Sequence, residues 1–440
     1  MLHGGCTQAR TRGIVSFFLG FLLCYALAAA YLSSTCYRDP SSVFFRPEHA
    51  RVLSYSSFRI AEATEFGDRA ALHPPPKSTN STGPDFCIGV ASVSRHGFSY
   101  LKETLGSVLQ GLDRLERRRI HLVVFLAHAN QSQHEDHRQP WLVNMADNLP
   151  AYPSNPETRR LVQQLEADSS YEAHALKQKM DYVVLLTECA KVNPKYTMTL
   201  EDDVVAVDGW YHRALGALQV ATRKTHDLGR DSFLYLRLFY DGRLLGWNAE
   251  EWPIYVVYSM AVLLAEVVIT AALRWRFTVL RQYLTRAVLL ILCGVCTPML
   301  IGLFFAAGRS CMLPRPSGID LMSRYGCCAQ GLVFPQDQVV NHLLPMYRNS
   351  QDSHAAVDTF LENWADSRDE LRWAVTPVLI QHVGGKSSHG AGDQQTGRLT
   401  DDMPFDYSFE MNDPVALAEE HRAWIAGAIY EPHPGAARDG

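Results

Sequence analysis

Three consecutive carboxylates, Glu201, Asp202 and Asp203, directly follow an apolar run that begins at Tyr196. Neighbouring carboxylates repel one another and shift each other's pKa, whereas a divalent cation with oxygen ligands converts that repulsion into a binding site. The pattern therefore predicts a strand within residues 196–207 that leads into a Mn²⁺ or Mg²⁺ site. The alternative is an acidic turn that only caps a strand, and the three residues alone do not exclude it.

Strands and helices alternate along the chain on both sides of this acidic segment. The predicted strands are residues 86–93, 121–127, 232–240, 332–335 and 374–383, the predicted helices are residues 100–115, 157–189, 209–222 and 353–364, and residues 128–156 are predicted to form a long loop. This alternation favours an α/β fold with a mainly parallel sheet covered by helices on both faces. In such sheets ligands bind beyond the carboxyl ends of the strands, where Glu201 to Asp203 fall.

Three apolar runs, residues 14–32, 253–273 and 287–307, are long enough to cross a membrane. The loop between the second and third runs, residues 274–286, carries four arginines and no acid. The positive-inside rule places this loop and the short N-terminus in the cytosol, so that the segments on the other side are lumenal. The first run lacks a clear small-residue cleavage site, which favours a signal anchor over a removed signal peptide.

Neither half of the α/β pattern has enough strands for a nucleotide-binding lobe, so we expect one lumenal domain that a membrane hairpin interrupts. The predicted order is a cytosolic tail (1–13), a transmembrane signal anchor (14–32), a lumenal stem (33–85), the first part of the domain (86–252), the hairpin (253–307) with its cytosolic loop (274–286), the second part of the domain (308–400) and a C-terminal tail (401–440). The formal net charge of -5 excludes a broad nucleic-acid-binding surface.

The cysteines and glycosylation sequons agree with a lumenal domain. Asn80 and Asn130 each begin a sequon. Six of the ten cysteines lie in the predicted lumenal parts, where disulfides persist: Cys36, Cys87, Cys189, Cys311, Cys327 and Cys328. The sequence does not give their pairing, but the adjacent Cys327 and Cys328 are expected to bond to two different partners.

The order of several short motifs resembles the Golgi N-acetylgalactosamine (GalNAc) transferases that act on glycosylphosphatidylinositol (GPI) anchors. The motifs are Ser92–Arg95 after the first strand, Lys177–Tyr182, Glu201–Asp203, Tyr235–Leu238 before the hairpin, Cys327–Cys328 leading to Phe334–Pro335, and Gln381–Gly384 followed by Ser387 and Ser388. The resemblance covers residues 86–390 and leaves residues 390–440 without a counterpart. It implies a GT-A-like nucleotide-sugar transferase domain that is split by the hairpin, and transfer of GalNAc from UDP-GalNAc to a GPI mannose.

The resemblance also implies ligands for the ion and the nucleotide. Asp203 would bind Mn²⁺ or Mg²⁺ directly, and Glu201 and Asp202 would contribute to the ion or to the ribose. The ion would bridge the two phosphates and stabilise the UDP leaving group. His382, after the last strand, would contact the metal or the diphosphate, and the alternative is a histidine that is satisfied structurally at a strand end.

Three further residues acquire expected roles in the same way. Arg95 and Lys179 would contact uracil, ribose or phosphate, although surface arginines and lysines are common. A β-linked product from an α-linked UDP-sugar requires inversion, so a base must accept the proton of the acceptor hydroxyl. Asp358 matches an aspartate of the family at a suitable position, and the alternative is a first-turn carboxylate that the helix dipole favours.

These expectations describe a multi-pass Golgi membrane enzyme whose acceptors are GPI-anchored proteins. Two alternatives stay open at this point. One is a glycosyltransferase with another UDP-sugar or another lipid- or protein-linked acceptor. The other is a non-catalytic lumenal scaffold on a transferase fold, which detectable UDP hydrolysis would distinguish from an enzyme.

Overall fold

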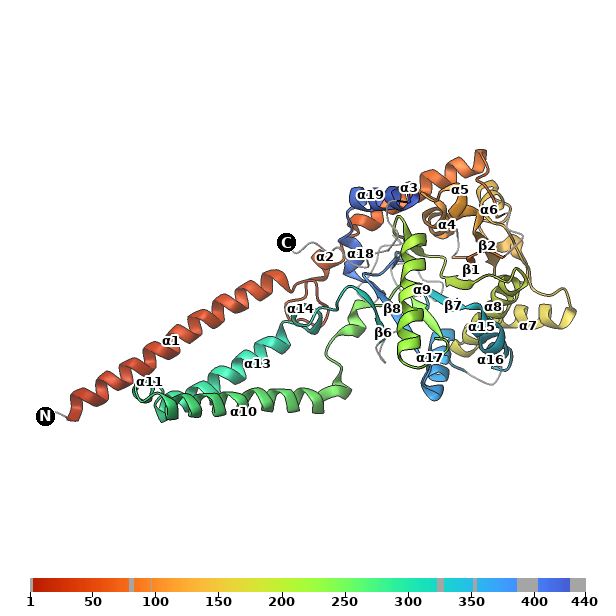
Figure 1. Ribbon diagram of the computed structural model, residues 1–440. Coiled ribbons are helices and arrows are strands. Elements are labelled where there is room, and N and C mark those ends of the chain that lie inside the picture. The colour runs from red at the N-terminus through yellow and green to blue at the C-terminus, as the bar shows by residue number, and fades with distance from the viewer. Residues whose placement is uncertain are drawn as a thin grey trace. The chain divides into compact units, whose positions relative to one another are not determined.

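The computed structural model describes residues 3–78, 83–95, 97–322, 328–350, 354–385 and 403–427 (Figure 1). The chain divides into two compact units. We call the first the helical unit, which contains Met1–Ala50 and Gly242–Arg315, and the second the sheet unit, which contains Arg51–Asp241 and Pro316–Gly440.

The helical unit contains the three predicted spans. Its candidate spans are Gly13–Thr35, Gly242–Arg276 and Arg286–Ala306, and each contains an 18-residue stretch of high mean hydropathy (2.2, 2.2 and 2.5). Their length and apolar surface suit a membrane, as the sequence predicted. The elements of this unit are α1 (His3–Thr35), α2 (Pro47–Ala50), η2 (Gly242–Leu245), η3 (Ala249–Glu251), α10 (Trp252–Arg276), α11 (Leu280–Tyr283), α12 (Arg286–Ile291), the π-helical η4 (Leu292–Cys296), α13 (Thr297–Ala306) and α14 (Arg309–Met312).

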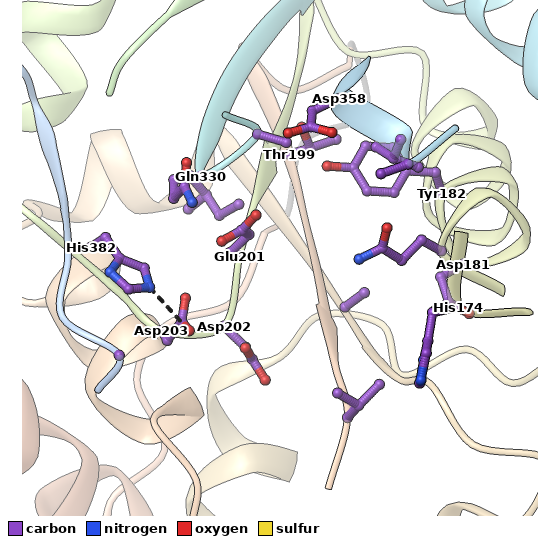
Figure 2. Close-up of a pocket in the computed structure, with 18 of the residues that line it drawn as sticks. His174, Asp181, Tyr182, Thr199, Glu201, Asp202, Asp203, Gln330, Asp358 and His382 are labelled. Atoms are coloured by element: carbon purple, nitrogen blue, oxygen red, sulfur yellow. Dashed lines mark ion pairs between the residues drawn. The ribbon is translucent and has the colours of Figure 1, made fainter. Parts of the chain in front are cut away.

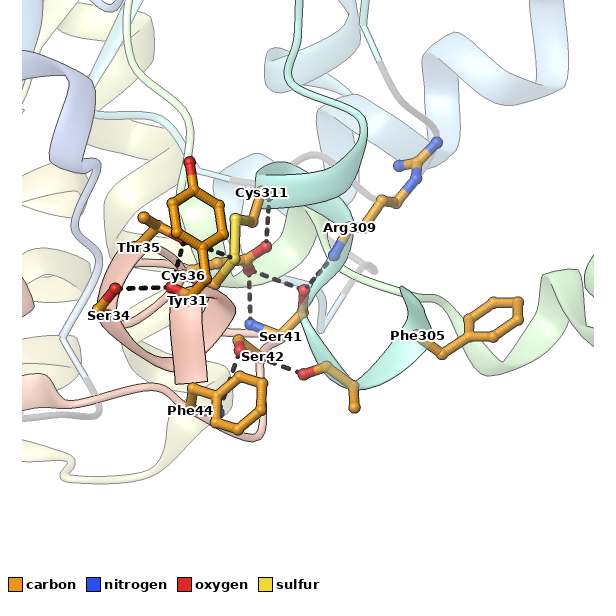
Figure 3. Close-up of a disulfide and its surroundings, with 12 residues drawn as sticks. Tyr31, Ser34, Thr35, Cys36, Ser41, Ser42, Phe44, Phe305, Arg309 and Cys311 are labelled. Atoms are coloured by element: carbon orange, nitrogen blue, oxygen red, sulfur yellow. Dashed lines mark hydrogen bonds between the residues drawn. A yellow bond between two sulfur atoms is a disulfide. The ribbon is translucent and has the colours of Figure 1, made fainter. Parts of the chain in front are cut away.

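A disulfide joins the ends of the first and third spans (Figure 3). Cys36 follows α1 and bonds to Cys311 in α14. Asp39 fixes the same junction, because its Oδ2 accepts a 2.8 Å hydrogen bond from the backbone N–H of Cys311. Gly308 has φ 93° there, and a Cβ atom on it would lie 2.4 Å from Asp39 Oδ2. Cys36 and Cys311 therefore lie on the same side of any membrane that the helices cross.

Strands from both sides of the hairpin form a single seven-stranded sheet in the order β2-β1-β3-β7-β5-β8-β6. The strands are β1 (Phe86–Ser92), β2 (Ile120–Leu126), β3 (Tyr196–Leu200), β5 (Tyr235–Arg237), β6 (Gly318–Leu321), β7 (Gly331–Pro335) and β8 (Arg372–Thr376), and a separate two-stranded sheet pairs β4 (Val204–Ala206) with β9 (Ile380–His382). Five strands of the large sheet run in one direction, and β6 and β7 run oppositely. The sheet is therefore mixed rather than mainly parallel. The antiparallel strand β7 lies in its interior, between β3 and β5.

Helices cover both faces of this sheet, as the alternation of side chains along β1 illustrates. Phe86 packs against Trp210 of α9, with ring centroids 5.8 Å apart. The next residue, Cys87, points to the other face and bonds to Cys189 of α8. The helices of the sheet unit are α3 (Ser54–Leu72), α4 (Leu101–Leu109), α5 (Arg114–Arg118), η1 (Gln131–Gln133), α6 (Pro140–Met145), α7 (Pro156–Ala167), α8 (Tyr171–Lys191), α9 (Trp210–Asp227), α15 (Gln336–Gln338), the π-helical η5 (Val339–Leu343), α16 (Leu344–Arg348), α17 (Val357–Arg368), α18 (Tyr407–Glu410) and α19 (Pro414–Ile425).

Several predicted elements are divided in two. The predicted helix 100–115 becomes α4 and α5, because Gly111 adopts φ 87° between them. The predicted helix 157–189 becomes α7 and α8, because the Ser170 side chain accepts a hydrogen bond from Ala173 N and starts a new helix. The predicted loop 128–156 contains η1 and α6. Within the predicted lumenal stem, α3 packs against α4, where a Cβ atom on Gly106 would lie 2.3 Å from Ala63 O.

Candidate functional site

The acidic residues lie in the turn between β3 and β4, at the carboxyl end of β3 (Figure 2). β3 pairs in parallel with β1, so the carboxyl ends of both strands meet at one edge of the sheet. Thr104 of α4 holds the turn from the opposite side, since its hydroxyl lies 2.8 Å from both Asp202 O and Val204 O and accepts from Val204 N at 3.1 Å. The turn is thereby fixed at three backbone atoms, which orients its carboxylates.

Asp202 is fully engaged by protein groups. Arg95, three residues after β1, donates two hydrogen bonds of 2.7 Å, one to each carboxylate oxygen of Asp202. The Ser92 hydroxyl also donates to Asp202 Oδ2. Burial alone would lower the pKa of Arg95, but the negative charge of Asp202 outweighs it and raises that pKa. Arg95 and Asp202, both predicted to contact the nucleotide, therefore neutralise each other in a buried bidentate ion pair.

Asp203 meets His382, which comes from the far end of the sequence. β4 pairs antiparallel with β9, and this register sets Val204 opposite His382. His382 Nε2 lies 3.5 Å from Asp203 Oδ2, and Figure 2 marks this ion pair with a dashed line. Burial alone would raise the pKa of Asp203, but the charges of His382 and Arg95 lower it to about 2. The second oxygen, Asp203 Oδ1, is buried and has no hydrogen-bond partner within the described part of the chain.

Gly384 permits this close approach. A Cβ atom on Gly384 would lie 2.3 Å from Asp203 Oδ2, so any larger residue would displace the carboxylate. The backbone N–H of Val383 donates a 2.9 Å hydrogen bond to Asp203 O and keeps the two segments together. The Gln381–Gly384 motif therefore supplies both an imidazole and the space beside Asp203.

Glu201 lies between this pair and Asp358 in the view of Figure 2. Burial and the negative charges of Asp203 and Asp358 raise the pKa of Glu201 to about 8, although His382 opposes the shift. A carboxylate with so raised a pKa lacks a sufficient positive counter-charge. The neighbouring protein groups therefore do not fully neutralise the negative charge of the group formed by Glu201, Asp203 and His382.

A cavity of about 640 Å³ opens over these residues. Its wall includes six of the seven predicted site residues, namely Arg95, Glu201, Asp202, Asp203, Asp358 and His382. Asp358 stands in the first turn of α17, where its Oδ1 accepts a 2.6 Å hydrogen bond from Thr359 N. The seventh residue, Lys179, is not among the described residues that line the cavity. Its ammonium instead lies 5.2 Å from the ring centroid of Phe360, and burial lowers its pKa.

One residue behind the site escaped the sequence prediction. His134 is buried in the expected loop, and its Nε2 lies 2.9 Å from the Ser92 hydroxyl that binds Asp202. Its Nδ1 accepts a 3.1 Å hydrogen bond from Asp136 N, so Nε2 carries the proton of a neutral ring. Burial accordingly lowers the pKa of His134 to about 4. A lone histidine in a polar segment has no spacing that could have indicated this role.

Part of the chain is similar to a known glycosyltransferase. Over 147 residues it is 27% identical to the Alpha-1,3-mannosyl-glycoprotein 4-beta-N-acetylglucosaminyltransferase B of Danio rerio. The match covers 30% of this chain and 25% of that protein. The chain thus spans about a quarter of the length of this relative, which indicates a distant relation among glycosyltransferases.

A family model matches far more of the chain. The model described as "GPI-N-acetylgalactosamine transferase PGAP4" covers residues 86–381. This range contains both parts of the seven-stranded sheet, the inserted apolar helices and the acidic turn. It ends at the residue before His382 and does not include α18 and α19. The chain belongs to the PGAP4 family of GPI-N-acetylgalactosamine transferases.

Proposed function

We propose that this chain transfers GalNAc from UDP-GalNAc to a mannose of the GPI-anchor glycan, with inversion at the anomeric carbon. The observation that carries the proposal is the convergence of Glu201, Asp203 and His382 at the wall of one cavity. A volume of about 640 Å³ lies within the range typical of small-molecule sites. The family supplies the sugar and the class of acceptor. A GT-A-like arrangement of the domain belongs to the same proposal.

The residues present fit a divalent ion at Asp203 better than at Asp202. Asp203 Oδ1 is buried and no described residue bonds to it, and an unsatisfied buried oxygen is costly unless a ligand binds it. Both oxygens of Asp202 already accept from Arg95. We therefore assign Mn²⁺ or Mg²⁺ to Asp203 and His382 with Glu201 as a third ligand, and we assign Asp202 to the positioning of Arg95. The bound ion would supply Lewis-acid stabilisation to the departing diphosphate.

Asp358 is the residue that we assign as general base. Its carboxylate lines the cavity and raises the pKa of Glu201, so the two groups are within electrostatic reach of one another. Its position in the first turn of α17 is one where the helix dipole favours a carboxylate. The ionised carboxylate accepts the proton of the acceptor hydroxyl as that oxygen attacks the anomeric carbon. The hydroxyl oxygen thereby forms the new bond while the UDP oxygen leaves with its electron pair.

We assign Arg95 and Lys179 less direct roles than the sequence suggested. Arg95 lines the cavity, and its pairing with Asp202 holds the guanidinium in place. Lys179 lies over Phe360, and we leave it out of the donor site.

We further propose that the sheet unit faces the Golgi lumen. The Cys36–Cys311 and Cys87–Cys189 disulfides suit an oxidising compartment. Asn130 is exposed, so its sequon is accessible to glycosylation, whereas Asn80 lies outside the described residues, as does Cys327. The arginines of residues 274–286 favour a cytosolic position for the loop between the spans. A GPI acceptor stays in the lumenal leaflet, and membrane anchoring of the enzyme raises its effective concentration.

The test is a panel of UDP-sugars presented to the purified full-length protein in detergent with Mn²⁺. The proposal predicts release of UDP chiefly from UDP-GalNAc, and transfer of GalNAc when a GPI glycan is added. Release from a different UDP-sugar would reassign the donor. UDP at the background level with every sugar would favour the non-catalytic scaffold.

A further inference from the structure

A second cluster of metal-ligating side chains lies where three helices of the sheet unit meet. Glu116 belongs to α5, His212 to α9 and His421 to α19. One potential ligand atom from each of these residues lies within 4.8 Å of the other two. All three residues are at least nine-tenths buried, with exposed fractions of 5%, 2% and 4%. None of them is among the residues that line the cavity described above.

Each histidine directs one ring nitrogen at a carboxylate outside the cluster. His421 Nδ1 lies 3.2 Å from Asp208 Oδ1, and His212 Nε2 lies 3.1 Å from Glu420 Oε1. A carboxylate on the outer nitrogen fixes the tautomer of a metal-bound imidazole and raises its basicity. Both histidines therefore have the outer hydrogen bond that accompanies metal ligation.

The other ring nitrogens are Nε2 of His421 and Nδ1 of His212. His421 Nε2 lies 3.0 Å from Glu116 Oε2. His212 Nδ1 is buried and has no hydrogen-bond partner among the described residues, which is costly for a polar atom in a protein interior. Gly209 precedes α9 with φ 69°, and a Cβ atom there would lie 3.1 Å from His212 Nδ1. The absence of a side chain at Gly209 thus leaves space beside an imidazole nitrogen that no described protein group satisfies.

We propose that Glu116, His212 and His421 bind a Zn²⁺ ion that fastens α19 to α5 and α9. Two imidazoles and one carboxylate form a ligand set typical of zinc and unlike the all-oxygen sets of Ca²⁺ and Mg²⁺. α19 lies beyond the residues that match the family, so this ion would hold an additional C-terminal segment in place. The proposal does not depend on the catalytic assignment.

Binding of an ion would require a change in the orientation of the two imidazole rings. The rings of His212 and His421 are stacked, with centroids 5.3 Å apart and an interplanar angle of 26°. An ion in the plane of both rings requires one of them to rotate about its Cβ–Cγ bond. The competing arrangement is an imidazolium at His421 that bridges Glu116 and Asp208 without any ion. The two arrangements differ in metal content, which an experiment can measure.

The experiment uses the full-length Asp203→Ala protein in detergent, because that background removes the proposed catalytic ion. The protein is equilibrated with Zn²⁺, passed through a desalting column and analysed for zinc by mass spectrometry. We expect about one tightly bound Zn²⁺ per chain. His212→Ala and His421→Ala should each lose that ion. His226→Ala, a change of an exposed histidine on the same helix α9, should keep it and is the matched control.

X-ray absorption at the zinc edge of the Asp203→Ala protein provides a measurement that needs no cluster variant. Scattering from two imidazoles supports the proposal even where His212→Ala or His421→Ala fails to fold. Absence of bound zinc from the folded protein, a zinc signal without imidazole, or zinc retained in both histidine variants would overturn it.

Discussion

Two buried charge clusters in the sheet unit differ in how completely their charges are paired. In the first, which we call the arginine cluster, Arg237 of β5 donates a 2.5 Å hydrogen bond to Glu362 Oε1 and a 2.8 Å hydrogen bond to the Tyr235 hydroxyl. Arg372 donates to the other oxygen, Glu362 Oε2, at 2.6 Å. Asp366 binds the outer end of Arg372. Both oxygens of the central carboxylate are thus satisfied by protein groups.

The acidic turn shows the opposite balance. Its three carboxylates have Arg95 and His382 as their positive neighbours, and Arg95 donates two hydrogen bonds to Asp202 and one to Asp203. Asp203 Oδ1 has no hydrogen-bond partner among the residues that the structure describes, and the pKa of Glu201 is raised. Each cluster includes residues of a motif that supports the family resemblance, Tyr235–Leu238 in one and Glu201–Asp203 in the other. Under the proposed function, the balanced cluster stabilises the fold, whereas the unbalanced one at the cavity accepts a ligand.

The largest effect should come from Asp358, on the side of the cavity away from the Asp203–His382 pair. Asp358→Asn removes the proposed base and should lower kcat for transfer on the order of a hundredfold to ten-thousandfold. UDP binding should change little, because Asp358 acts on the acceptor. The measurement is steady-state transfer to a GPI glycan. Asp366→Asn, on the same helix α17, is the control, and a kcat for Asp358→Asn equal to that of the control would remove the base assignment.

A substitution in the arginine cluster should lower the stability of the fold. Glu362→Gln leaves the buried Arg237 without its counter-charge, and breaking such a pair costs about 3–5 kcal/mol. Thermal unfolding followed by tryptophan fluorescence should show a clearly lower midpoint for this variant. Asp366→Asn touches only the outer end of Arg372, where the aspartate is half exposed, and should change stability by less than about 1 kcal/mol. Equal midpoints for the two variants would contradict the pairing argument.

The smallest effect concerns the pH response of His134. Its pKa in the folded protein is about 4, below its ordinary value of 6.5. The unfolded chain therefore takes up the proton first as the pH falls, so His134 contributes stability that is complete above pH 6.5 and is lost between pH 6.5 and 4. His134→Gln keeps a donor for Ser92 and an acceptor for Asp136 N but does not titrate.

The unfolding midpoint of His134→Gln should consequently fall less than that of the unmodified protein between pH 6.5 and 5. All other titrating groups are shared by the two proteins, so the difference isolates the histidine. Parallel pH profiles would show that this imidazole is not held neutral behind Ser92.

The sequence predicted the features that depend on local pattern. The three spans follow from charge-poor apolar runs, and the strand that leads into Glu201 follows from an apolar segment that meets carboxylates. Strand identity was correct for β1, β2 and β7, with ends within a residue or two. The family followed from the order of short motifs and is confirmed over residues 86–381.

The remaining features depend on contacts between distant residues. The register of β4 against β9 brings His382 to Asp203, and no local pattern specifies that register. The pairing of Arg95 with Asp202 depends on the parallel alignment of β1 and β3, so the arginine could not be recognised in advance as a partner of the acidic turn. The burial of Lys179 against Phe360 of α17 is a tertiary contact of the same kind.

The most direct test of the central claim is the effect of Mn²⁺ on UDP binding, measured by titration calorimetry with the full-length protein. The account predicts that Mn²⁺ strengthens UDP binding in the unmodified protein and that Asp203→Asn abolishes this enhancement. Asp202→Asn should retain it, because the Asp202 oxygens are occupied by Arg95 rather than by the ion. An undiminished response to Mn²⁺ in Asp203→Asn, or a loss confined to Asp202→Asn, would contradict the account.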